Sequence, residues 1–196
     1  MLYFKNIRWK NLLSTGNQFT EIQLNKTSTT LIVGENGSGK STILDALCFG
    51  LFSKPFRRIN RPQLINSIND GGLLVEIEFE VGSKSYMIRR GIKKNIFEIF
   101  VDGKRLNQDA KTQDQQEYLE KTILKLNYKS FTQIVLLGAN HYIPFMQLKT
   151  TDRRNIIEDL LDIQIFSVMN GLLKYKISEN KEDSQNIEVN RKLACG

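Results

Sequence analysis

The chain has 196 residues, 40% of them hydrophobic, so it is long enough to bury one core with an appended extension. Its 28 basic and 21 acidic residues give a net charge of +7, which attracts polyanions but does not by itself distinguish DNA contact from a solvated basic face. No apolar run approaches the roughly 18 to 20 residues that span a bilayer, and no signal-peptide core opens the chain. Cys48 and Cys195 are too few for a disulfide framework or a metal site, so we expect a soluble protein in a reducing, cytoplasmic setting.

Strands are predicted at the start of the chain. Residues 2–9 (LYFKNIRW) and 17–26 (NQFTEIQLNK) predict two strands joined by a turn near residues 14–17. The β-branched run at 29–33 (TTLIV) is typical of a short, buried central strand. Residues 41–52 then predict a helix that is apolar nearly all round, and such a helix packs inside against a sheet.

An antiparallel meander is predicted over residues 73–103. In the first strand, 73–81 (LLVEIEFEV), apolar residues alternate with three glutamates, which predicts one buried and one wet face. Gly-Ser and Asp-Gly turns separate the segments that follow, KSYMIRRGI and NIFEIFVDG. Basic residues cluster here, and the candidates for contact with DNA phosphates are Arg89, Arg90, Lys93 and Lys94.

The rest of the chain is predicted to be mainly helical. Residues 109–127 predict a polar helix, whereas 130–138 (SFTQIVLLG) predicts a further strand that ends in glycine. From Thr150 a cap signal opens a helical pattern of about 40 residues, which would extend roughly 60 Å and therefore project as an arm. We predict two domains, 1–150 and 151–196, and expect the chain to be a fragment of a longer protein.

Residues 34–42 (GENGSGKST) satisfy the phosphate-loop pattern G-x-x-x-x-G-K-[ST], between a predicted strand and a predicted helix. Glycine allows positive φ angles and lets backbone N–H groups approach phosphate oxygens at the positive end of the helix. Lys40 is predicted to stabilise the β and γ phosphates of ATP, Ser41 to ligate Mg²⁺, and Thr42 to bond the α phosphate. The other candidate nucleotide-binding residues from the pattern are Gly34, Gly37, Ser38 and Gly39.

Hydrolysis needs more than this cradle: an acid at the end of an apolar strand and a group that orients the attacking water. Asp102 ends an apolar strand, but Gly103 follows it, which favours a hairpin turn. The glutamates of 73–81 fit an exposed row, Glu158 and Asp159 lie in the C-terminal helical pattern, and the single histidine, His141, fits a loop or packing role better. We therefore expect the general base to lie outside this chain.

Several stretches together resemble the N-terminal half of an ATPase head from the SMC-related DNA-repair ATPases that include SbcC. They are KNLLS at 10–14, the phosphate loop with LDAL after it, the RR hairpin segment, and residues 130–163, so the resemblance covers nearly the whole chain. KPFRRINRPQLINS at 54–67 resembles bacteriophage members in particular. The resemblance implies an α/β fold, a P-loop NTPase of ABC-ATPase type in which a mixed sheet with an antiparallel meander surrounds the phosphate-loop helix.

The resemblance also implies what lies outside the chain. A long coiled coil would split the head, the C-terminal half of the same head would supply the carboxylate strand, and a second copy would supply the signature loop in an ATP-dependent dimer. A nuclease subunit and DNA are the other implied partners, and no membrane is implied.

Some site residues are assigned by the resemblance alone. Asn36 would lie near the γ phosphate, and residues 10–15 near the base. Leu13 replaces an arginine of some relatives, which puts that contact in doubt. Ala139 replaces a glutamine that reaches Mg²⁺, and either Asn140 or Gln133 is left as a candidate substitute.

We therefore expect an ATPase subunit of a DNA double-strand-break repair and recombination nuclease complex, in which ATP-driven head dimerisation and hydrolysis regulate DNA binding and the partner nuclease. One alternative is an SMC-like or RecF-like DNA clamp without a nuclease partner. A transporter-type ABC ATPase is a further alternative, against which the interrupted head argues.

Overall fold

The computed structural model describes residues 2–69, 72–93, 95–106, 112–136, 143–161 and 163–194. The chain divides into two compact units, Met1–Leu148 and Lys149–Gly196, each of which is described by itself.

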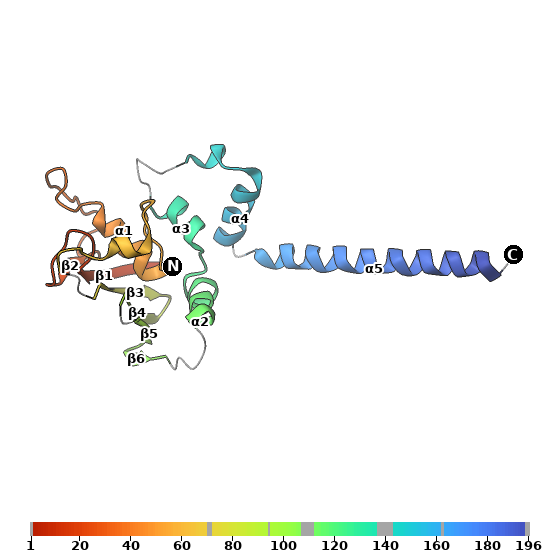
Figure 1. Cartoon of the computed structure of the whole chain (residues 1–196), viewed down its shortest axis with the longest axis horizontal. Helices are drawn as coiled ribbons and strands as arrows, with labels where there is room; N and C mark the ends of the chain where they lie inside the picture. The colour runs from red at the N-terminus through yellow and green to blue at the C-terminus, as the bar shows by residue number, and fades with distance from the viewer. Residues whose placement is uncertain are drawn as a thin grey trace. The chain divides into compact units, whose positions relative to one another are not determined.

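A six-stranded sheet forms the framework of the first unit, with the strand order β2-β1-β3-β4-β5-β6 (Figure 1). The strands are β1 (Leu2–Lys10), β2 (Thr20–Gln23), β3 (Leu74–Val81), β4 (Lys84–Gly91), β5 (Phe97–Val101) and β6 (Lys104–Arg105). These strands confirm the predicted N-terminal hairpin and the predicted meander. Every pairing in this sheet is antiparallel, so the mixed character expected for the sheet is not seen among the described residues.

The register of the sheet places one row of isoleucines on its inner face. Ile7 pairs with Ile77, Ile77 with Ile88, and Ile88 with Ile99, and all four side chains are fully buried. Because side chains alternate along a strand, this register buries the apolar side of each strand at once. The phosphate-loop helix packs against β1, β3 and β4, the strands that carry Ile7, Ile77 and Ile88.

The helix α1 (Thr42–Phe52) confirms the predicted helix, and all its residues except Ile43 and Leu44 are buried. It packs closest to the sheet at Gly50, where an added Cβ would lie 2.4 Å from Cδ1 of Ile77. The missing side chain therefore lets the helix backbone approach β3.

Shorter helices complete the first unit: η1 (Arg61–Leu64), α2 (Thr112–Tyr118), the π-helical η2 (Leu119–Leu124), α3 (Tyr128–Ile134) and η3 (Phe145–Gln147). Over their described residues, α2 and η2 confirm the predicted helix at 109–127. The predicted strand at 130–138 is wrong, because α3 occupies its described start. Asn127 caps this helix by accepting a hydrogen bond from the Ser130 N–H, and Phe131 is fully buried.

The predicted central strand at 29–33 is also not formed. These residues belong to no helix or strand, and Leu31 and Val33 are 85% and 80% exposed. A strand needs a neighbour that pairs its backbone groups, and no strand in the described part of the chain lies against this run.

The second unit contains α4 (Thr150–Leu160) and α5 (Gln164–Ala194), so the single helix expected from Thr150 is interrupted after Leu160. The 31 residues of α5 correspond to about 46 Å of straight helix. Apolar side chains on its first half are more than half exposed: Ile165, Phe166, Val168, Met169, Leu172, Leu173, Tyr175 and Ile177. Among the described residues, no helix has both the length and the hydropathy that crossing a membrane requires. That this unit begins a coiled-coil arm stays a prediction.

Candidate nucleotide-binding site

The phosphate loop enters α1 with the backbone geometry that its glycines allow. Gly37 and Gly39 have φ angles of 89° and 92°, in the left-handed region that favours glycine. The Thr42 N–H donates to the Gly39 carbonyl at 2.9 Å, and no side chain caps the helix at Ser41. The first N–H groups of α1 therefore form the positive helix end at which an anion binds.

Lys40 lies against the loop. Its Nζ donates to the carbonyl oxygens of Gly34 and Glu35, each at 2.6 Å. The ammonium group is thus held by backbone acceptors next to the positive helix end.

A cavity of about 440 Å³ opens at this end of α1. Its wall contains six of the eight predicted loop residues, and also Leu13 and Ser14 from the segment expected near the base and Arg57 from the loop after α1. The loop residues on the wall are Asn36, Gly37, Gly39, Lys40, Ser41 and Thr42, whereas Gly34 and Ser38 lie outside it. No Asp or Glu is among the described residues of the wall.

Arg57 is the site residue that sequence reasoning missed. Its backbone N–H donates to Oδ1 of Asp45 at 3.0 Å, its Nε donates to Oδ2 at 2.6 Å, and its Nη2 lies 2.6 Å from Oδ2. Asp45 is fully buried in the first turn of α1. The sequence contained a signal for this pair: Asp45 is a carboxylate within an apolar helix, and a buried charge requires a partner of opposite charge.

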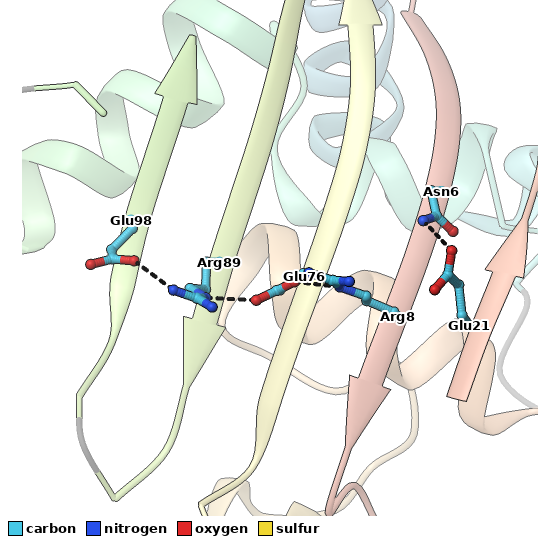
Figure 2. A network of polar contacts seen from close by, with 6 residues as sticks. All are labelled: Asn6, Arg8, Glu21, Glu76, Arg89 and Glu98. Atoms are coloured by element: carbon cyan, nitrogen blue, oxygen red, sulfur yellow. Dashed lines mark hydrogen bonds and ion pairs between the residues drawn. The ribbon is translucent and has the colours of Figure 1, made fainter. Parts of the chain in front are cut away.

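The glutamates of β3 do not form the exposed row expected of them. Glu76 is only 3% exposed and lies between Arg8 on β1 and Arg89 on β4, at 2.5 Å and 2.6 Å from their Nε atoms. Figure 2 shows this row continuing from Arg89 to Glu98 on β5, with Nη1 of Arg89 3.6 Å from Oε2 of Glu98. Glu76 is therefore a structural acid. The hairpin predicted at Asp102 is confirmed, since Asp102 and Gly103 connect the antiparallel strands β5 and β6.

The candidates for DNA contact lie in different surroundings. Arg89 belongs to the row of ion pairs just described, and Lys93 is exposed in the turn between β4 and β5. Arg90 is only 3% exposed and donates its hydrogen bonds to groups inside the unit, so its assignment to DNA contact is corrected. Lys94 lies outside the described residues.

The candidate Mg²⁺ ligands are also separated. Ser41 lies on the cavity wall, whereas Gln133 lies on α3, where its Oε1 is buried without a hydrogen-bond partner. Asn140, Ala139 and His141 lie outside the described residues. In the described part of the chain, no group of three or more His, Cys, Asp or Glu side chains is placed to hold a metal ion.

A family model described as an AAA domain matches residues 6–194. The chain belongs to this family. Exonuclease subunit 2 of Escherichia phage RB69 is 45% identical over 185 residues, which cover 94% of this chain and 33% of the phage protein. The protein of the same name from Enterobacteria phage T4 is 48% identical over 168 residues, covering 86% of this chain and 30% of that protein.

More distant relatives extend the same picture. The DNA double-strand break repair Rad50 ATPase of Thermoplasma acidophilum is 30% identical over 82% of this chain and 20% of its own length. This chain therefore spans a third or less of the curated relatives it matches. These relatives confirm the resemblance to SMC-related DNA-repair ATPases and to their bacteriophage members.

Solved structures support the fold. The crystal structure of the Smc head domain with an extended coiled coil, derived from Pyrococcus furiosus, matches 96% of this chain and 49% of that chain at 21% identity, with a TM-score of 0.65. This likeness confirms the P-loop ATPase head fold of ABC type.

Proposed function

We propose that this chain forms the N-terminal half of an ATP-binding head in a DNA double-strand-break repair and recombination nuclease complex. ATP-driven dimerisation and hydrolysis would regulate DNA binding and the partner nuclease. The observation that carries the proposal is the cavity at the N-terminal end of α1, where Lys40, Ser41 and Arg57 converge. The names of the phage and Rad50 relatives support the setting in DNA repair.

The residues of this cavity fit a magnesium–nucleotide complex. Backbone N–H groups and the Lys40 ammonium match the charge of a polyphosphate, and the Ser41 hydroxyl is an oxygen ligand of the kind that Mg²⁺ accepts. The charge of Arg57 is paired with Asp45, so this guanidinium offers the phosphates its remaining N–H donors rather than a further net charge. ATP supplies a phosphoanhydride bond, and Mg²⁺ neutralises its phosphates. In our proposal Lys40 exchanges its two carbonyl acceptors for phosphate oxygens. Arg57 needs no such exchange, since Asp45 already holds it at the cavity edge.

Two observations favour the proposal that segments outside residues 1–196 complete the sheet and the cavity of this head. The apolar run at 29–33 stands directly before the phosphate loop and is largely exposed, although β-branched residues of this kind favour buried strands. The described cavity wall also contains no carboxylate that would activate water. We propose that the C-terminal half of the same head supplies the pairing strand and the acid, and that a second copy completes the site.

The DNA contact is proposed for the turn between β4 and β5. Arg89 is engaged by Glu76 and Glu98, whereas Lys93 is exposed, so Lys93 is the better candidate among the described residues, and Lys94 stays a candidate from the sequence alone. Contacts of this kind neutralise phosphates without reading bases, and they predict that the DNA affinity falls steeply with salt.

The test is ATP-dependent dimerisation and DNA binding of the full-length protein. Lys40→Ala should abolish dimerisation, because the phosphates lose their closest cation, whereas the matched control Lys84→Ala, at the exposed start of β4, should behave as the wild type. If Lys40→Ala and the wild type dimerised equally, the proposed mechanism would be wrong. Co-purification of a metal-dependent nuclease would favour this proposal over a clamp without a nuclease partner. Residues 1–196 alone should hydrolyse ATP negligibly.

A further inference from the structure

The C-terminal end of the phosphate-loop helix is held by side chains from two other elements. Arg90, on β4, donates from Nε to the Gly50 carbonyl at 2.8 Å and from Nη2 to the Leu51 carbonyl at 3.4 Å. Gln116, on α2, donates from Nε2 to the Leu51 carbonyl at 3.0 Å and accepts a 2.6 Å hydrogen bond from Nη2 of Arg90. Two helix carbonyls, the buried Arg90 and the part-buried Gln116 thus form one network, which we call the α1 clamp.

The clamp contains a buried charge. The guanidinium of Arg90 is stacked on Phe97, with Cζ 3.8 Å from the ring centroid, and it donates hydrogen bonds to the carbonyl oxygens of Gly50 and Leu51 and to the amide oxygen of Gln116. Burial, and then the nearby charge of Arg61, lowers the pKa of Arg90 to about 9. The negative end of a helix stabilises such a cation. An apolar side chain would fill the same space without a desolvation penalty, so the arginine is best explained by the two carbonyls that it fixes.

The opposite end of the same helix forms the cavity. The 11 residues of α1 span about 16 Å, and a helix of this length moves as a rigid rod. Its first turn carries the N–H groups of the positive helix end and Asp45, which holds Arg57, and Lys40 lies just before it. A shift or rotation at the clamped end is therefore transmitted to every group that faces the phosphates.

We propose that Arg90, together with Gln116, is a positioning residue of the nucleotide site. The clamp sets the axial position and rotation of α1 on the sheet, and so determines where the helix amides, Lys40 and Arg57 meet the phosphates. This inference rests on the proposed function and names a structural control of the same site. Because Gln116 also donates to Glu120 at the start of η2, the α2–η2 segment shares in this control.

The experiment measures two quantities in variants of the full-length protein: the affinity for magnesium-ATP and the protection of the α1 amides from hydrogen exchange. Arg90→Met keeps the length and apolar bulk of the side chain but removes its donors, whereas Arg90→Lys keeps the positive charge and a single donor group. Ile99→Ala, a core deletion on β5, is the control for a general loss of stability. All variants are measured at a temperature at which circular dichroism shows them folded, and Gln116→Leu replaces Arg90→Met if that variant does not fold.

We expect Arg90→Met to weaken magnesium-ATP binding tenfold or more, Arg90→Lys to be intermediate, and Ile99→Ala to stay within twofold of the wild type. Without nucleotide, amide hydrogen exchange in residues 42–48 should accelerate more in Arg90→Met than in Ile99→Ala. Unchanged affinity in Arg90→Met, or an equal loss in Ile99→Ala, would overturn the inference while leaving the proposed function intact. If the wild type and Lys40→Ala bound magnesium-ATP equally, the proposed function would fail, and the positioning role with it.

Discussion

Gly50 is the point of closest approach between α1 and the sheet, so a single added methyl group there tests how tightly the helix is seated. In Gly50→Ala the new Cβ would lie 2.4 Å from Cδ1 of Ile77 and 3.1 Å from Cγ1 of both Ile77 and Val75. Both neighbours are fully buried, so neither side chain can move into solvent to relieve the contact.

Two effects oppose each other in this variant. Alanine is more favourable than glycine in a helix interior by about 1 kcal/mol. Overpacking a well-packed core costs about 1–3 kcal/mol, and a contact of 2.4 Å belongs at the upper end of that range. We therefore expect a net loss of about 1–2 kcal/mol in the free energy of unfolding, or a fall of roughly 2 to 8 °C in Tm.

The assay is urea and thermal unfolding of a double-mutant cycle followed by circular dichroism. Ile77→Val removes the atom in closest contact and on its own should cost about 0.5–1.5 kcal/mol. In the double variant the clash is relieved. The stability loss measured for the double variant should therefore be about 1 kcal/mol smaller than the sum of the losses measured for the two single variants. Strict additivity, or a Gly50→Ala variant as stable as the wild type, would show that α1 is not seated on β3 as described.

Two further predictions concern buried groups of the first unit. Glu76→Gln should lower the free energy of unfolding by about 1–3 kcal/mol because it leaves two arginines without their shared carboxylate, whereas Glu78→Gln should change it by less than about 0.5 kcal/mol; equal effects in urea unfolding would contradict this assignment. Burial, and then the charge of Asp45, raises the pKa of the Cys48 thiol far above its usual range, so iodoacetamide should modify Cys48 slowly in folded Cys195→Ser protein and rapidly in urea. Above the unfolded pKa of roughly 8.5 the thiol ionises in the unfolded chain but not in the folded one, so its contribution to the free energy of unfolding is fully present below that pH and declines above it. Rapid modification of the folded protein at pH 8.5 would contradict the burial of Cys48.

Features that depend on neighbouring residues were readable from the sequence. The meander follows from alternation and from Gly-Ser and Asp-Gly turns, and α1 follows from an apolar run after a glycine loop. The phosphate loop could be found because its chemistry lies in consecutive residues, whose backbone N–H groups and one lysine form the cradle. Turn conformations and helix starts are local properties, so a short window of sequence is sufficient for them.

Features that depend on contacts between distant segments could not be predicted from the sequence. The run at 29–33 has strand-forming residues, yet a strand exists only beside a partner, and no described strand pairs with it. At 130–134 the sequence predicted a strand, but the Asn127 cap and the burial of Phe131 favour the helix α3.

The charged residues show the same division most clearly. By itself, the sequence determined where a phosphate could be cradled and which residues carry charge. Only the tertiary structure decided that Arg57 faces the cavity, that Glu76 is buried between two arginines, and that Arg90 holds the far end of α1. The physical reason is that the effect of a charge depends on its partner and its exposure. Those partners stand 12 to 68 positions away in the chain, brought close only by the packing of helix and sheet.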